Sequence, residues 1–433
     1  MRTKARQGSF AIGHISWGLL LTLLACMRKA HRRWSVVVAT LLAAGNLVAT
    51  QTAASSTPSS SNVPGTPAIS TQQVRNSAQA VHVSGVIVAA VTSTGTGHKP
   101  PPEPAYNGTP PLLFNGNPPT CFFSPCDEGD VMMTASTGPL VVVPIFWNPA
   151  GFPMTSSYKN IITSYLADVA KMSGQTQNVF SVLDEYSGNN GQIHYNVKLG
   201  LVFNDTDPLP ADGCTLDPSD TSGIYADGSG YSACLDDTQL QAEVDKVTAA
   251  NSLPHDLTHI YVLYLPKGVE SCFLPGETTS VAPNGQFCTI NHQPTAAYCA
   301  YHSTDLASAV YANMAYPIYA SPVGFTCGSD ARFPVLESPN GNPDADTEIS
   351  PTSHEISEAI TDPDTETGWY DSHGNEIGDD CAYIYGSTRG APGAYFNQVI
   401  NGGHFLTQTE FSNNVFTASG GQAGCVQSAS QEH

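Results

Sequence analysis

The sequence predicts an α/β domain in which a mostly buried sheet is flanked by helices. Continuous apolar runs rich in branched residues occur at 139–147 and 258–265, and two stretches with a single apolar stripe lie between them, at 155–173 and 237–251. Continuous apolar runs are typical of strands that are buried on both faces. Because such strands alternate here with helical patterns, we expect a layered α/β fold stabilised by disulfides.

The remaining elements have weaker signals. Residues 193–203 are predicted to form a further strand, 86–91 a short strand, and a strand is expected near 310–320. The rest of 266–342 has the composition of loops and holds four cysteines.

A helix is predicted from Ser350 to Asp362. Ser350 can cap its N-terminus, and Pro351 suits the first helical position, where a missing N–H costs nothing. The ring of Pro363 disfavours a helical conformation at Asp362, so the helix is expected to end there. The acidic residues at 344–348 are then expected in solvent, near the positive end of the helix dipole.

The first 54 residues are interpreted as a signal or targeting segment. Basic residues precede two apolar runs, 15–26 and 35–50, and small residues follow the second run, as in secretory signals. The main basic cluster directly follows Met27, so either translation begins at Met27 or the signal is unusually long. A retained membrane anchor is the alternative, although neither run reaches the roughly 20 residues of a span.

Residues 55–127 are predicted to be a linker rich in Ser, Thr and Pro, and 128–433 to be the globular domain. Seven of the 16 Lys and Arg residues lie in the first 54 positions, which hold no Asp or Glu. The rest of the chain therefore carries nine basic against 37 acidic residues, a formal charge of −28. This balance argues against nucleic acid and anionic membranes as partners.

The cysteine count agrees with export. One of the 11 cysteines, Cys26, lies within the targeting segment, and the other ten form an even set. In a secreted chain such a set predicts disulfides rather than thiolate metal ligands. We expect the pairs Cys121–Cys126, Cys214–Cys234 and Cys381–Cys425.

A His-Glu-x-x-Glu string on the predicted site helix carries the candidate chemistry. His354 and Glu358 are four residues apart and share one face, with Glu355 beside them. The string differs by one residue from the zinc-peptidase signature His-Glu-x-x-His, in which two ligands flank a general base. It therefore predicts His354 and Glu358 as metal ligands and Glu355 as the catalytic base. Glu376 or Asp379 is the expected third ligand.

The donor set limits the choice of metal. One histidine and two carboxylates would cancel the charge of zinc and leave it a weaker Lewis acid. Zinc is the first candidate, and the same set also suits manganese or calcium. The alternative without a metal is a polar helix face that is hydrogen-bonded to a nearby loop. His259 is assigned to a hydrogen-bonded position in a strand, and His373 to a solvated loop.

The motifs that surround the string resemble one protein family. Together with His354-Glu-x-x-Glu358, the pairs Asp362-Pro363 and Trp369-Tyr370 and the stretch Glu376-Ile-x-Asp379-x-Cys381 resemble the EXORDIUM, or phosphate-induced protein, family. That family comprises secreted plant proteins and microbial relatives, and the resemblance covers about 135–426. It implies an extracellular protein associated with cell walls and growth control, and a single site at 354–381. It does not imply hydrolysis.

Two functions follow as hypotheses. The first is a secreted metal-dependent hydrolase, most simply a peptidase. The second is a non-catalytic extracellular wall, matrix or growth-signalling protein, in which a metal or a hydrogen-bonded cluster braces the helix. Extracellular peptides, proteins or wall polymers are the expected partners. The two hypotheses differ in whether Glu355 faces an open cleft or is buried against protein.

Overall fold

The structure is a computed structural model. It describes residues 83–88, 90–91, 103–114, 129–216, 221, 223–225, 227–273, 287–289, 298–305, 308–319, 325–364 and 367–431. All of these belong to the second of two units in the chain, Pro67–His433. The predicted targeting segment and the predicted Cys121–Cys126 pair lie outside the described residues.

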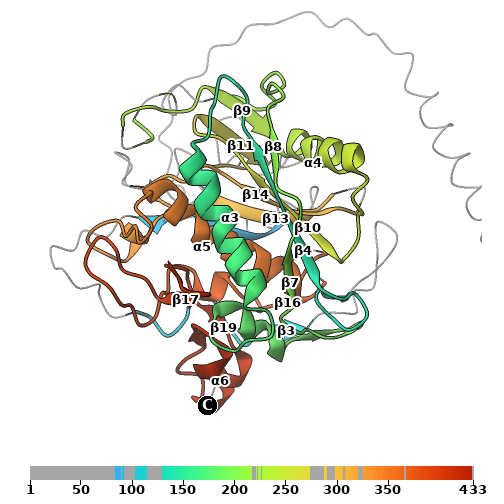
Figure 1. Ribbon diagram of the computed structural model, residues 1–433. Coiled ribbons are helices and arrows are strands. Elements are labelled where there is room, and N and C mark those ends of the chain that lie inside the picture. Colours follow the sequence, from blue (N-terminus) through green and yellow to red (C-terminus); the bar gives the residue numbers. More distant parts are fainter. Residues whose placement is uncertain are drawn as a thin grey trace, which may run out of the picture. The chain divides into compact units, whose positions relative to one another are not determined.

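A mixed sheet is the central element of the described part of the chain (Figure 1). Its strands lie in the order β1-β13-β14-β10-β4-β7, and β8 also pairs with β4. The pairs that involve β4 and β10 are parallel, whereas β13 is antiparallel to both of its neighbours. The strands are Val83–Val88 (β1), Leu140–Trp147 (β4), Val197–Leu199 (β7), Phe203–Asp205 (β8), His259–Tyr264 (β10), Tyr298–Thr304 (β13) and Val310–Met314 (β14).

The two long apolar runs are confirmed as neighbouring strands, because β4 and β10 pair along their lengths. The predicted strand at 193–203 is instead two short strands, β7 and β8, separated by residues 200–202. The strand expected near 310–320 ends at Met314. Strand β13 was not predicted, since it lies in the region whose composition suggested loops.

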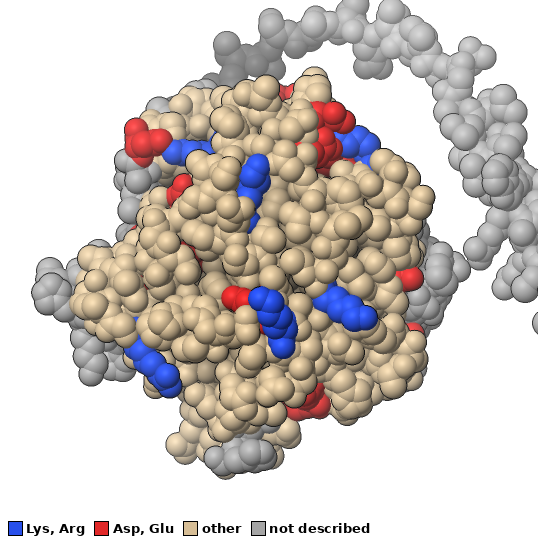
Figure 2. All heavy atoms as spheres, in the orientation of Figure 1, with Lys and Arg blue, Asp and Glu red and all other residues tan. Residues whose placement is uncertain are grey.

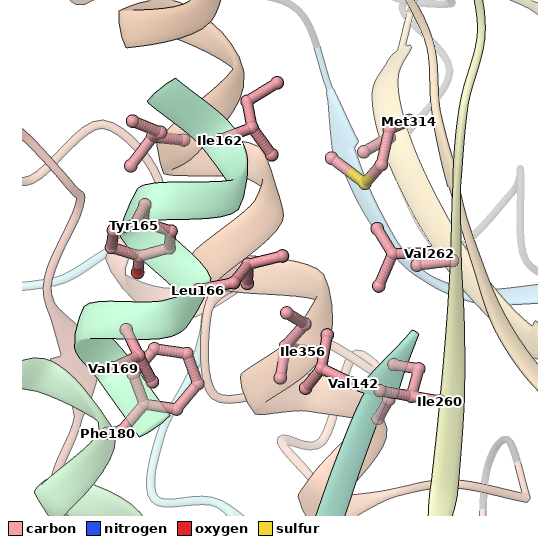
Figure 3. Packing of buried hydrophobic residues seen from close by; sticks show 14 of the residues in the cluster. Val142, Ile162, Tyr165, Leu166, Val169, Phe180, Ile260, Val262, Met314 and Ile356 are labelled. Atoms are coloured by element: carbon pink, nitrogen blue, oxygen red, sulfur yellow. The ribbon is translucent and has the colours of Figure 1, made fainter. Parts of the chain in front are cut away.

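Helices cover both faces of the sheet. Helices α3 (Ser156–Lys171) and α5 (Pro343–Thr361) contact each other and pack on one face, whereas α4 (Asp237–Asn251) packs on the other. Alternate residues of β4 separate the two layers, because Val142 belongs to the first core cluster and Val143 to the second. In Figure 3, Leu166 of α3 and Ile356 of α5 lie beside the strands at Val142. This three-layer packing holds α5 directly against the sheet.

Local signals account for α3 and α4, which were both predicted within two residues of their bounds. The Thr155 side chain caps α3 by accepting from the backbone N–H of Tyr158. Asp236 caps α4 in a capping box: its side chain accepts from the backbone N–H of Gln239, and the Gln239 side chain accepts from the backbone N–H of Asp236.

Helix α5 ends at Thr361, as predicted from Pro363, but its predicted start was wrong. The helix begins at Pro343, with Asn342 as its N-cap, instead of at Ser350. Both prolines can occupy a first turn, and the Asn342-Pro343 pair provides the stronger start because the Asn342 side chain accepts from the N–H of Ala345. Pro351 therefore lies inside the helix.

The expectation that residues 344–348 are solvated was also wrong for two of the acidic side chains. Asp346 and Glu348 are buried. Asp346 accepts hydrogen bonds from Ser338 and from the side chain of Asn340. Burial raises the pKa of Glu348 well above its usual value.

Four disulfides join cysteines of the described residues. The predicted pairs Cys214–Cys234 and Cys381–Cys425 are confirmed, and Cys272–Cys288 and Cys299–Cys327 are further pairs. Disulfides are compatible with an extracellular protein. None of the helices in the described part of the chain has the length and apolar content needed to cross a lipid bilayer.

Segments of the predicted linker at 55–127 take part in the fold. Strand β1 pairs with β13, and β3 (Leu113–Phe114) pairs with β16 (Trp369–Tyr370). The carboxylate of Glu103 accepts from the backbone N–H groups of Tyr385 and Gly386. The boundary expected at residue 128 therefore does not separate these segments from the folded part.

The other elements are short. They are β2 (Ala90–Val91), β5 (Ser187–Gly188), β6 (Gly191–Gln192), β9 (Ala233–Asp236), β11 (Val269–Phe273), β12 (Phe287–Cys288), β15 (Phe325–Thr326), β17 (Gln398–Ile400), β18 (Gly403–Phe405), β19 (Glu410–Phe411), β20 (Cys425–Val426), α6 (Asn413–Ala418) and the 3-10 helices Val179–Glu185, Ser329–Ala331, Asp379–Cys381 and Ala429–Gln431. On the face shown in Figure 2, Lys and Arg side chains are scattered, several of them beside Asp or Glu, and form no basic patch.

Candidate metal centre

Five side chains from three segments form a histidine–carboxylate cluster beneath the surface. Helix α5 contributes the three residues of the His-Glu-x-x-Glu string, β13 contributes His302, and the 3-10 helix at 379–381 contributes Asp379. The two histidines and the two glutamates are 0% exposed, and the Asp379 side chain is 8% exposed. The five residues are His302, His354, Glu355, Glu358 and Asp379.

The first group within the cluster is the predicted one, His354, Glu358 and Asp379. His354 Nε2 lies 3.1 Å from Glu358 Oε1 and 3.7 Å from Asp379 Oδ1. One ligand atom from each residue lies within 4.8 Å of the others. With bonds of about 2.0–2.2 Å, ligands of one zinc ion stand no more than about 4.4 Å apart. The group therefore has roughly the dimensions of a metal site, and the structure brings Asp379 to the predicted ligand pair.

The backbone before Cys381 holds Glu358 in place. The N–H groups of Gly378 and Asp379 donate to Glu358 Oε1 at 3.2 and 3.0 Å. Hydrogen bonds to a carboxylate stabilise its charged form. Cys381 is joined to Cys425, so the disulfide fixes the segment that supplies both the donors and Asp379.

The ring of His354 is oriented by Gln408. The Gln408 amide nitrogen donates to the carbonyl oxygen of Gly378 at 3.1 Å and also contacts His354 Nδ1. Because an amide nitrogen only donates, Nδ1 accepts and Nε2 carries the proton that faces Glu358. A metal bound at Nε2 would require this proton to move to Nδ1 and the Gln408 amide to turn. Burial is the largest single influence and lowers the pKa of His354, but the charge and hydrogen bond of Glu358, the charge of Asp379 and the contact with Gln408 together outweigh it, so the pKa is raised.

The second group was not predicted and consists of His302, Glu355 and Glu358. His302 Nδ1 lies 3.4 Å from Glu355 Oε2 and 3.8 Å from Glu358 Oε2. His302 Nε2 lies 3.2 Å from the backbone carbonyl oxygen of Asp362. Since a carbonyl can only accept, Nε2 carries a proton, and Nδ1 is the ring nitrogen that faces the two carboxylates.

Within the described part of the chain, these carboxylates lie beside the two histidines of the cluster. A further buried carboxyl group, Glu410, belongs to β19. Burial and then the nearby Glu358 charge raise the pKa of Glu410 well above its usual value. The surroundings therefore favour a neutral Glu410 and disfavour any additional negative charge.

The other candidate residues are placed as follows. Glu376 is buried, but it belongs to neither group of mutually close ligand atoms among the described residues, and its backbone N–H donates to Asp379 Oδ2. His373 is exposed and its Nδ1 contacts the Thr109 hydroxyl, as expected for a loop histidine. His259 is half-buried at the start of β10 and contacts Thr258 and Asp256.

Access to the cluster is restricted. Glu355 is 0% exposed and faces His302 inside the protein, so it does not line an open cleft. A small pocket beside the same helix is lined by Asp346, Thr347 and Ser350, but none of the five cluster residues lines it. This burial is the observation that distinguishes the two functional hypotheses.

Comparison of the chain with protein-family models, with curated proteins and with solved structures finds no match. The EXORDIUM resemblance therefore remains a prediction from the motifs at 354–381.

Proposed function

We propose that this is an extracellular protein whose histidine–carboxylate cluster binds a divalent metal ion, and that the ion braces α5 against β13 and the segment at 378–381. We favour a structural role over a catalytic one because Glu355 is completely buried and a substrate could not reach it. The four disulfides and the signal-like N-terminal sequence support an extracellular location.

The need for a cation follows from electrostatics. Glu355, Glu358 and Asp379 bring three carboxyl groups into one small, largely buried region, where each additional negative charge is costly. Buried charges in proteins are paired or coordinate metals. A divalent ion would offset two of the three negative charges and connect three separate segments of the chain.

The donor set favours a metal that accepts both imidazole and carboxylate ligands. Zinc, with bonds of about 2.0–2.2 Å to these donors, is the first candidate, and manganese is the next. Calcium is the weaker candidate because it takes about 6–8 oxygen ligands, and both groups in the cluster include a histidine.

Metal analysis and thermal unfolding of the purified protein test this proposal. Wild-type protein should contain a divalent metal, and a chelator should lower its melting temperature. A ligand present at about 1,000 times its Kd stabilises by about 4 kcal/mol, on the order of 10 °C for a domain of this size. The proposal is wrong if the protein is metal-free and its melting temperature does not change with added zinc, manganese or calcium.

A metal-dependent hydrolase is the second candidate function, favoured by the position of Glu355. Glu355 Oε1 lies 4.0 Å from His354 Nε2, farther than the atoms of Glu358 and Asp379 that face the same nitrogen. A general base would stand beside the ligands in this way and would accept a proton from the attacking water. The metal, as a Lewis acid, would polarise the scissile carbonyl.

Glu355→Gln and Glu358→Gln together separate the two functions. If the centre is a brace, both changes should destabilise the protein by about 1–3 kcal/mol, because each alters a buried polar contact. If the protein is a hydrolase, Glu355→Gln should keep its metal and its melting temperature and abolish peptide or ester turnover. Urea unfolding, metal content and turnover of both variants, compared with wild type, provide the answer.

A further inference from the structure

We propose that the cluster binds two divalent ions, with Glu358 as the ligand that bridges them, and that His302 holds the second ion together with Glu355. This inference rests on the proposed metal-binding function and extends it by a second site. It makes Glu355 a ligand of the second ion instead of a base.

The two histidines cannot serve one ion in the observed arrangement. The five side chains form two groups, one built on each histidine, and within each group the ligand atoms lie within 4.8 Å of one another. Ligand atoms of one ion must lie within about twice the metal–ligand bond length, or about 4.4 Å, of each other. His302 and His354 belong to different groups, so each marks its own site.

Glu358 belongs to both groups and uses a different oxygen for each. Its Oε1 faces His354 Nε2 at 3.1 Å, and its Oε2 faces His302 Nδ1 at 3.8 Å. The carboxylate thus presents one oxygen to each histidine nitrogen, which is the arrangement of a carboxylate that bridges two metal ions. Metal pairs of this kind, about 3.5–4 Å apart, are common in proteins.

The hydrogen bonds around Glu358 leave the second group well suited to a metal. Glu358 Oε1 accepts from the N–H groups of Gly378 and Asp379, whereas Oε2 faces His302 Nδ1. Binding in the first group requires a proton shift on His354. In the second, the contact with the Asp362 carbonyl keeps a proton on His302 Nε2, the ring nitrogen that points away from the carboxylates.

The position of His302 on the sheet supports a ligand role. It lies on β13 two residues after Ala300, which belongs to the core cluster that α5 packs against, and it is 0% exposed. A metal-ligating histidine commonly donates its other ring N–H to a backbone carbonyl or a carboxylate, as His302 does to Asp362.

The metal-to-protein ratio tests the inference. Purified full-length protein is loaded with zinc chloride, passed through a desalting column and analysed by native mass spectrometry. We expect about two ions per wild-type chain, about one for His302→Ala, and two for His194→Ala, an exposed histidine that serves as the control. A wild-type ratio of one overturns the inference and leaves the proposed metal-binding function standing. A ratio of zero overturns both.

A second measurement on the wild-type protein covers the case in which His302→Ala does not fold. Manganese chloride is substituted for zinc, and the electron paramagnetic resonance spectrum is recorded. Two ions bridged by one carboxylate should give the broadened spectrum of a spin-coupled pair. The resolved six-line spectrum of isolated manganese at full loading would contradict the inference.

Discussion

His354→Ala is expected to abolish metal binding in the first group and to destabilise the protein by about 3–5 kcal/mol, the usual cost of removing one partner of a buried ion pair. The side chain is 0% exposed and faces Glu358 and Asp379 at 3.1 and 3.7 Å. Its removal takes away the imidazole ring that faces both carboxylates and leaves a cavity between them. Urea unfolding gives the free energy of unfolding, and metal analysis gives the occupancy.

His194→Ala is the matched control for this change. His194 is exposed, and its backbone N–H bond to the carbonyl oxygen of Met133 does not depend on the side chain. Its loss should change the free energy of unfolding by no more than about 0.5 kcal/mol and leave the metal in place. If His354→Ala is as stable as His194→Ala and keeps its metal, the cluster does not have the role assigned to it.

Elements with strong local signals could be predicted from the sequence. Helices α3 and α4 begin at side chains that cap them, and β4 and β10 are continuous apolar runs. Each of these signals lies inside the element that it defines or directly before it. Packing of the sheet against both helix layers then requires these same elements, so local and tertiary preferences agree.

The start of α5 could not be placed because two local signals compete. Pro343 and Pro351 both suit a first turn, and the rule that proline disfavours a helix interior favours the later one. In the structure, the buried residues Ala345, Ile349 and Ile356 pack within one core cluster along the whole helix. We attribute the tolerance of Pro351 to this packing, since burial of an apolar helix face can outweigh one lost hydrogen bond.

The candidate site could be predicted only in part, because some of its residues are far apart in the sequence. His354, Glu355 and Glu358 share one helical turn, so their spacing alone brings them together. Asp379 could be proposed as one of two alternatives because it follows the helix closely in sequence. His302 lies 52 residues before His354 and belongs to a strand without a clear signal, so only the three-dimensional structure places it in the cluster.

Gly378→Ala is expected to displace the His354 ring and to cost both stability and metal. A Cβ atom at Gly378 would lie 2.6 Å from His354 Nδ1 and 2.8 Å from Cγ, closer than nonbonded atoms can approach. The ring has little freedom to move, because Gln408 contacts one side of it and Glu358 the other. Overpacking of this kind costs about 1–3 kcal/mol, and a displaced ring would no longer present Nε2 to the cluster. Thermal unfolding and metal analysis measure the two effects.

Variants at two other glycines distinguish a local steric effect on His354 from a general loss of stability. Gly151→Ala should be neutral, because nothing lies within 4 Å of the added atom. Gly200→Ala should destabilise the protein but keep the metal, because its Cβ would meet the side chains of Val141 and Val143 at 2.8 and 2.9 Å, on a different segment from the cluster. Metal lost equally from the Gly378 and Gly200 variants would mean that binding responds to overall stability. Metal lost from the Gly378 variant alone would show that the geometry at His354 controls it.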